Sequence, residues 1–241
     1  LGATSGDTGA AAIQGVRGKE GIKICILHPH GKVSKVQELQ MTTVNDENVL
    51  NLSVHGNFDD CQNLVKGMFN DLEFRDAISL SGVNSINWGR IMSQVVYYFS
   101  AALSLGAPDR AVSFTVPTGN FGDIFAGYVA KKMGLPIDQL IIATNDNDIL
   151  ARTLDSGAYE MRGVEQTTSP SMDIQISSNF ERLLFEAHDR DASAVRGLMD
   201  SMKQSGGFTI SEKPLSAIRS EFAAGRSTVA ETAATIKSVL D

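Results

Sequence analysis

Short apolar runs alternate with longer amphipathic stretches through the first 150 residues of the chain. The short runs have the length and branched-residue content of strands, and the amphipathic stretches have the spacing of helices. This alternation predicts an α/β fold built from βαβ units, with parallel sheets that helices cover on both faces. The predicted strands are residues 22–27, 49–54, 112–116 and 140–143, and the predicted helices are residues 7–17, 34–43, 59–70, 88–105 and 121–133.

The pattern changes after about residue 150, where helical spacing becomes dominant. Mostly helical structure is predicted for residues 171–189, 192–205, 211–224 and 227–239. We place a domain boundary after residue 80. Residues 1–80 are then part of a smaller α/β domain, and residues 81–241 form a larger α/β domain with a helical carboxyl-terminal portion.

Composition and charge narrow the classes of partner. The chain has 241 residues and is 42% apolar, which suits a globular protein with a substantial core. Its net charge of −7 argues against nucleic acid or an anionic membrane as a partner, because both require a basic surface. No apolar run is long enough to predict a membrane-spanning helix. The two cysteines, Cys25 and Cys61, predict no disulfide framework and are typical of a protein from the reducing cytoplasm.

Residues 2–9, Gly-Ala-Thr-Ser-Gly-Asp-Thr-Gly, form the first candidate site. Three glycines and three hydroxyl residues precede an alanine-rich stretch that is predicted to be helical. Glycine lets the backbone approach a ligand closely, and the amino end of a helix presents N–H groups, so this segment suits a carboxylate or a phosphate. The alternative is a tight turn into the helix, capped by Ser5 or Asp7. A strand normally precedes such a loop, and the sequence contains none before it.

Two further candidate sites are residues 116–123 (Val-Pro-Thr-Gly-Asn-Phe-Gly-Asp) and residues 84–90 (Asn-Ser-Ile-Asn-Trp-Gly-Arg). The first lies between a predicted strand and a predicted helix, as anion-binding loops do; its alternative is an ordinary turn. In the second, Asn84 and Ser85 can cap the next helix or donate to an oxyanion. Arg90 can bind a phosphate through two hydrogen bonds. The alternative is a helix cap followed by an exposed arginine.

Other polar clusters predict structure rather than chemistry. His28 and His30 flank a proline with no third ligand nearby, so they do not indicate a metal site. Residues 145–148, Asn-Asp-Asn-Asp, lack the glycine and the distal glutamate of a calcium-binding loop. We interpret them as a connection in which Asn147 or Asp148 caps a helix that begins at residue 149.

The three candidate segments, in this order, resemble threonine synthases of the longer, microbial and fungal type. Residues 40–43, 56–61 and 177–182 are also similar to that family, so the resemblance covers nearly the whole chain. It implies the tryptophan-synthase-β-like fold of pyridoxal-phosphate enzymes. It also implies the conversion of O-phosphohomoserine and water into L-threonine and phosphate, the last step of threonine biosynthesis.

The resemblance assigns a ligand group to each segment. The loop that receives the substrate's α-carboxylate would consist of Thr4, Ser5, Gly6, Asp7 and Thr8. The loop around the phosphate of pyridoxal 5′-phosphate would consist of Gly119, Asn120, Phe121, Gly122 and Asp123. The residues that hold the substrate's own phosphate would be Asn84, Ser85 and Arg90.

The resemblance further implies that the chain is a fragment, truncated at both ends. The family's Schiff-base lysine lies before the first glycine loop, upstream of Leu1, so we expect no catalytic residue in this chain and no activity from it alone. Two alternatives stay open. One is a related pyridoxal-phosphate-dependent lyase or dehydratase, whose substrate carries no phosphate for Arg90 to bind. The other is a non-catalytic homologue that binds a phosphorylated ligand.

Overall fold

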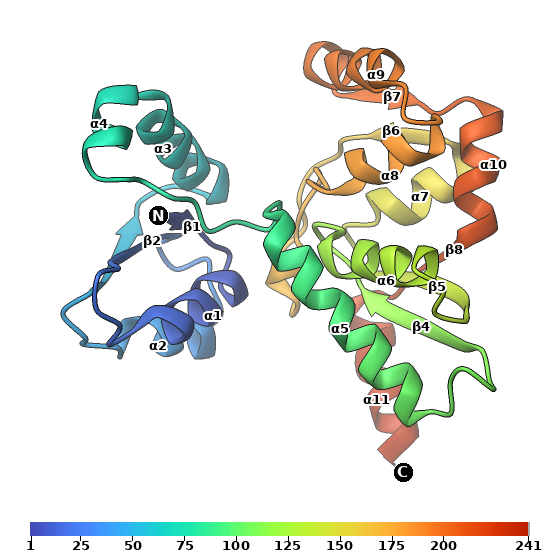
Figure 1. Cartoon of the computed structure of the whole chain (residues 1–241), viewed down its shortest axis with the longest axis horizontal. Helices are drawn as coiled ribbons and strands as arrows, with labels where there is room; N and C mark the ends of the chain where they lie inside the picture. Colours follow the sequence, from blue (N-terminus) through green and yellow to red (C-terminus); the bar gives the residue numbers. More distant parts are fainter. Residues whose placement is uncertain (241) are drawn as a thin grey trace. The chain divides into compact units, whose positions relative to one another are not determined.

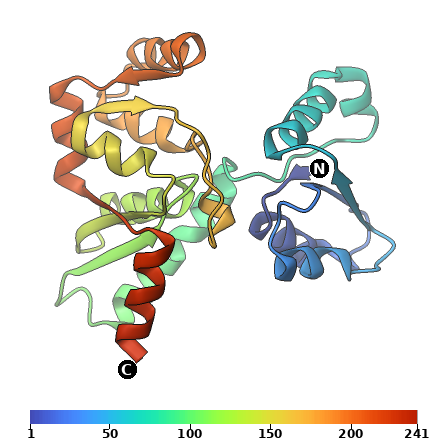
Figure 2. The same ribbon diagram turned by 180° about the vertical axis from the view of Figure 1, so that it is seen from behind.

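The chain divides into two compact units, Leu1–Asn87 and Trp88–Asp241. The structure is a computed structural model that describes residues 1–240, apart from the side chain of Asp59. In each unit helices pack around a small parallel sheet (Figures 1 and 2). The division follows Asn87 rather than residue 80. No helix among the described residues has both the length and the hydropathy needed to cross a bilayer.

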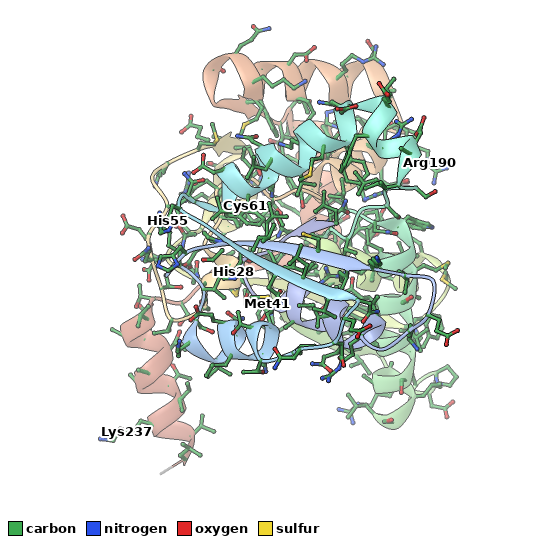
Figure 3. All side chains as sticks on the ribbon, turned by 90° about the vertical axis from the view of Figure 1, so that its left-hand side faces the viewer. His28, Met41, His55, Cys61, Arg190 and Lys237 are labelled. Atoms are coloured by element: carbon green, nitrogen blue, oxygen red, sulfur yellow. The ribbon has the colours of Figure 1, made fainter. Side chains whose placement is uncertain are left out.

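The first unit contains a three-stranded parallel sheet in the order β1-β2-β3. Helices α1 and α2 cover one face and α3 and α4 lie on the other side (Figure 1). Ile13 of α1, Ile26 of β2 and Met41 of α2 form the centre of a small core, and Figure 3 shows Met41 against the sheet. The elements are β1 (Gly2–Ala3), α1 (Asp7–Val16), β2 (Ile24–Pro29), α2 (Lys35–Thr42), β3 (Val49–Val54), α3 (Phe58–Asn70) and α4 (Leu72–Ala77).

The strand β1 was not expected from the sequence. Gly2 and Ala3 pair in parallel with Ile26 and Leu27 of β2, so the first glycine loop does follow a strand. On the outer edge of β1, the N–H of Val83 donates to the carbonyl of Leu1 over 2.9 Å. Two residues are too few to produce a strand pattern in the sequence, and only the pairing with β2 defines this strand.

The second unit contains a parallel sheet in the order β4-β5-β8 and a separate antiparallel pair, β6 and β7. Helix α11 ends the described chain, projects from this unit (Figure 2) and buries none of its residues. The elements are α5 (Trp88–Ser104), β4 (Val112–Pro117), α6 (Gly122–Lys132), β5 (Ile137–Thr144), α7 (Ile149–Ser156), β6 (Ala158–Glu160), η1 (Pro170–Met172), α8 (Phe180–Ala187), α9 (Ala192–Ser205), β7 (Gly207–Thr209), α10 (Glu212–Glu221), β8 (Phe222–Arg226) and α11 (Val229–Leu240).

Two of the predicted helices in this unit are partly wrong. Residues 171–189 contain one 3-10 turn and α8, and the residues between them run as an irregular segment. Residues 211–224 form a helix only as far as Glu221, after which Phe222–Arg226 pairs with β5. Alanines 223 and 224 favour a helix locally, but in the folded unit their backbone groups bond to the free edge of β5.

Tyr159 on β6 makes the stability of this unit sensitive to alkaline pH. The ring is 3% exposed, stacks on Phe180 and Phe208, and its hydroxyl accepts a 2.8 Å hydrogen bond from the N–H of Ser177. Burial raises the pKa of Tyr159 to about 12. The unfolded chain loses the same proton near pH 10, so the folded state is progressively destabilised as pH rises between those values.

We therefore expect Tyr159→Phe to be less stable than the wild type at pH 8 by about 1 kcal/mol, because a hydrogen bond is lost. The wild type should lose stability more steeply than the variant between pH 10 and about 12. Urea unfolding at several pH values measures both effects. Parallel stability curves for the two proteins would show that Tyr159 does not carry the alkaline sensitivity.

Candidate functional site

Thr4 shapes the first glycine loop, which leads from β1 into α1. Its N–H donates to the carbonyl of Leu27 over 3.0 Å, and its hydroxyl oxygen accepts from the N–H groups of Gly6 and Gly9 over 3.0 and 2.9 Å. The side chain is 2% exposed. Both acceptor positions of the hydroxyl are therefore used within the loop, and the buried Thr4 side chain holds the turn together by these two hydrogen bonds.

The loop turns into α1 at Gly6, which is the N-cap residue of that helix. Gly6 has a φ of 139°, a backbone conformation that favours glycine. Gly6 has no side chain to cap this helix, and the first-turn N–H of Gly9 donates to the Thr4 hydroxyl, so the alternative of a turn capped by Ser5 or Asp7 is wrong. Asp7 begins the helix with its side chain exposed and accepts a hydrogen bond from Gln37 of α2. Ser5 and Thr8 are half-buried on the same turn.

The second glycine loop joins β4 to α6 in the second unit. Phe121 adopts the left-handed region at φ 63°, serves as the N-cap residue of α6 and packs on Phe180 and Phe222. A Cβ added to Gly119 would lie 2.8 Å from the carbonyl oxygen of Ser171. The backbone of the loop is therefore in close contact with the segment before α8, and glycine is required at position 119.

Residues 177–179 hold the carbonyl groups of this loop. The hydroxyl of Ser177 donates to the carbonyl of Gly119 over 2.7 Å. Asn179, which is fully buried, donates to the carbonyl of Asn120 through its side-chain amide over 2.8 Å and through its N–H over 3.1 Å. The hydroxyl of Ser178 donates to the side-chain oxygen of Asn120 over 3.1 Å. We call residues 177–179 the brace.

The brace sets the direction of the donors in the loop. In a trans peptide the N–H points opposite to the carbonyl, so fixing the carbonyls of Gly119 and Asn120 turns the N–H groups of Asn120 and Phe121 the other way. Among the described parts of the chain, the N–H groups of Asn120, Phe121 and Gly122 donate to no other residue. Converging backbone donors at the start of a helix are what a phosphate group requires.

The third candidate segment divides between the two units. Asn84 and Ser85 belong to the first unit, where the side-chain oxygen of Asn84 accepts from the N–H of Ile86 over 3.0 Å and closes a turn. Arg90 belongs to the second unit, in the first turn of α5. Burial raises the pKa of the Asp123 carboxyl, whereas the Tyr98 hydroxyl and the Arg90 guanidinium act in the opposite direction. Arg90 therefore lies within electrostatic range of the second glycine loop.

Comparison with known proteins identifies the family. The sequence model described as pyridoxal-phosphate-dependent enzyme matches residues 1–202. The chain belongs to this pyridoxal-phosphate-dependent enzyme family. It is 56% identical to threonine synthase of Pseudomonas aeruginosa over 213 residues, which cover 88% of this chain and 45% of that protein. It is 49% identical to threonine synthase of Saccharomyces cerevisiae over 253 residues, which cover 100% of this chain and 49% of that protein.

Solved structures agree with this assignment. The pyridoxal-phosphate-bound threonine synthase from Brucella melitensis is 82% identical with a TM-score of 0.93, over 99% of this chain and 52% of that chain. Threonine synthase from Escherichia coli is 34% identical with a TM-score of 0.72, over 100% of this chain and 61% of that chain. The chain thus spans about half the length of the curated relatives it matches. The predicted α/β fold, the resemblance to threonine synthases and the family's cofactor, pyridoxal phosphate, are confirmed.

In this pyridoxal-phosphate family member, Asn145 and Asn147 belong to a polar cluster that supports the brace, and the predicted cap of α7 is wrong. Neither Asn147 nor Asp148 caps α7 through its side chain. Instead, the amide groups of Asn145 and Asn147 donate to the carboxylate of Asp173 over 2.8 and 3.1 Å. Asp173 also accepts from the hydroxyl of Thr167 over 2.6 Å. These contacts anchor the irregular segment that leads into the brace.

The residues of the brace carry no recognisable signal of their own. Ser177 and Asn179 belong to a stretch similar to the family, but their role depends on contacts with residues 119 and 120. Among the residues whose side chains the structure describes, no three His, Cys, Asp or Glu residues lie close enough together to hold a metal ion.

Proposed function

We propose that this chain is part of a threonine synthase that converts O-phosphohomoserine and water into L-threonine and phosphate. Four relatives that match 88–100% of this chain bear that name, at 47–56% identity. The observation that carries the proposal is the position of Arg90, near Asp123 of the second glycine loop. A pyridoxal-phosphate enzyme needs one anion-binding site for its cofactor, and Arg90 offers a second one for a phosphorylated substrate.

The donor types in the second unit suit the two phosphates differently. Gly119, Asn120, Phe121, Gly122 and Asp123 hold the cofactor phosphate in this proposal. Backbone N–H groups, whose direction the brace fixes, favour an anion that stays bound through every turnover. When bound, pyridoxal phosphate supplies an electron sink for the bonds that break and form next to the substrate's amino group.

The substrate's phosphate must leave after each turnover, so flexible side chains suit it better than a rigid backbone cradle. Asn84 and Ser85 with Arg90 hold this phosphate in the proposal, with the guanidinium as the main charge. The loop that consists of Thr4, Ser5, Gly6, Asp7 and Thr8 receives the α-carboxylate at the start of α1, without a contact from the Asp7 carboxylate itself. The first unit then contributes to the smaller domain of the enzyme and the second to the larger one. A cytoplasmic location accompanies the proposal and is supported by the two free cysteines.

An assay of the intact protein with pyridoxal phosphate tests the proposal. We expect release of inorganic phosphate and formation of threonine from O-phosphohomoserine. We expect little keto acid from L-serine or L-threonine, which lack the phosphate that Arg90 binds. Keto acid formation without phosphate release would identify a dehydratase instead. Binding of the cofactor with no turnover of any of these compounds would identify a non-catalytic homologue.

A further inference from the structure

Gln37 of α2 is fixed at both ends of its side-chain amide. Its oxygen accepts a 2.8 Å hydrogen bond from the hydroxyl of Ser34, the N-cap residue of α2. Its nitrogen donates to the carboxylate of Asp7. A carboxylate only accepts, so the amide can face Asp7 through its nitrogen alone. This orientation is the only one that satisfies both partners.

The amide of Gln37 also lies directly against the first glycine loop. A Cβ added to Gly6 would collide with the side-chain oxygen of Gln37. The side chain therefore occupies one flank of the turn from which α1 begins, and it is half-buried there. Gln37 contacts the loop at two neighbouring positions, Gly6 through packing and Asp7 through a hydrogen bond.

Asp7 is a potential competitor for the site that the loop is proposed to form. A carboxylate in the first turn of a helix is attracted to the positive end of the helix dipole. An incoming carboxylate would be attracted to the same end of α1. Asp7 is exposed, so without a partner its side chain could turn toward that end or repel the incoming anion.

We propose that Gln37 is a positioning residue, which holds the carboxylate of Asp7 against α2 and keeps the loop's donors available to the substrate's α-carboxylate. This inference rests on the proposed function, because it takes an amino-acid substrate as the ligand. Gln37 does not contact the substrate and acts only through Asp7. Its effect should therefore depend on whether the ligand carries a carboxylate, which a general loss of structure would not reproduce.

Two non-reacting ligands separate these effects in the intact, cofactor-loaded protein. One is the phosphonate analogue of O-phosphohomoserine, in which a CH2 group replaces the ester oxygen. The other is 3-aminopropyl phosphate, which lacks the α-carboxylate. We expect Gln37→Glu to raise the Kd of the phosphonate analogue about tenfold in a calorimetric titration, the size of a lost hydrogen bond to a charged group. The Kd of 3-aminopropyl phosphate should change less than about twofold.

A double variant that exchanges the donor and the acceptor tests whether the hydrogen bond between positions 7 and 37 restores binding. In the double variant Asp7→Asn/Gln37→Glu, the amide lies on α1 and the carboxylate on α2, so the hydrogen bond can form in the reverse direction. We expect the double variant to recover most of the affinity for the phosphonate analogue. Gln40→Glu adds the same charge to an exposed position of α2 and should leave both Kd values unchanged.

Equal weakening of both ligands by Gln37→Glu, or no recovery in the double variant, would overturn the inference. It would also be overturned if Gln40→Glu weakened the phosphonate analogue as strongly as Gln37→Glu does, since charge on α2 alone would then explain the effect. If the wild-type protein bound neither ligand, the proposed function itself would fail, together with this inference.

Discussion

Arg90→Ala is expected to lower kcat/KM for O-phosphohomoserine by on the order of 100-fold or more in the intact protein. Removing one member of a close, hydrogen-bonded charge pair typically costs about 2 to 5 kcal/mol, and each 1.4 kcal/mol or so is a factor of ten. Arg90 is in the first turn of α5, near Asp123 of the cofactor loop. Steady-state kinetics with a phosphate-release assay measures the effect.

Arg90→Lys separates the effect of the positive charge from the effect of the paired hydrogen bonds that a guanidinium can form. Lysine keeps the positive charge but cannot form two parallel hydrogen bonds to a phosphate, so we expect an intermediate loss. Arg110→Ala is the matched control, because Arg110 follows the carboxyl end of α5 and is exposed. If Arg90→Ala changed neither kcat nor KM for the phosphorylated substrate, the assignment of Arg90 to the substrate's phosphate would be wrong.

Local sequence pattern predicts most of the elements up to residue 150. The predicted bounds of β3 (Val49–Val54) are the observed ones. The observed ends of α1, α2, α3, α5 and α6 differ from the predicted ends by no more than one or two residues. In each of these elements the apolar residues recur with the spacing of a helix or a strand, and glycine, proline or capping residues mark where the element begins and ends. The two glycine loops can also be recognised from the sequence, because the residues of each loop are adjacent in the chain.

The elements that were missed depend on partners far away in the sequence. Residues Phe222–Arg226 become a strand because the edge of β5, about eighty residues earlier, offers them hydrogen bonds. Their own composition, Phe-Ala-Ala-Gly-Arg, favours no strand. The strands β6 and β7 have three residues each, which is too short for a period to appear.

The same limit applies to the candidate site. Residue types at the loops could be recognised, but the side chains that orient them could not. Asn179 acts on the carbonyl of Asn120 across a separation of 59 residues, and Gln37 acts on Asp7 across 30. Thr4 shows the converse, since its hydroxyl resembled a ligand-binding group in the sequence and is used as an internal acceptor in the fold.

Gly119→Ala is expected to weaken the binding of pyridoxal phosphate at least tenfold. The added Cβ would lie 2.8 Å from the carbonyl oxygen of Ser171 and 3.2 Å from the Cα of Met172. Either the backbone of the glycine loop or the backbone at residues 171–172 must therefore move. The Ser171 side is held by the 3-10 turn Pro170–Met172 and by the anchoring of Asp173. The loop should therefore shift instead, which turns its N–H donors away from the phosphate. Titration of the cofactor, followed by its absorbance, measures the loss.

Gly197→Ala is the matched control for this variant. A Cβ at Gly197, in α9, would meet nothing within 4 Å, so the same chemical change should stabilise the helix slightly and leave cofactor affinity unchanged. Unfolding curves for both variants separate a shifted loop from a general loss of structure. Wild-type cofactor affinity in Gly119→Ala would mean that the phosphate does not depend on the backbone of this loop. In that case the brace at Ser177 and Asn179 would serve the packing of α8 alone, because the carbonyls it holds would have no effect on the donors that bind the cofactor.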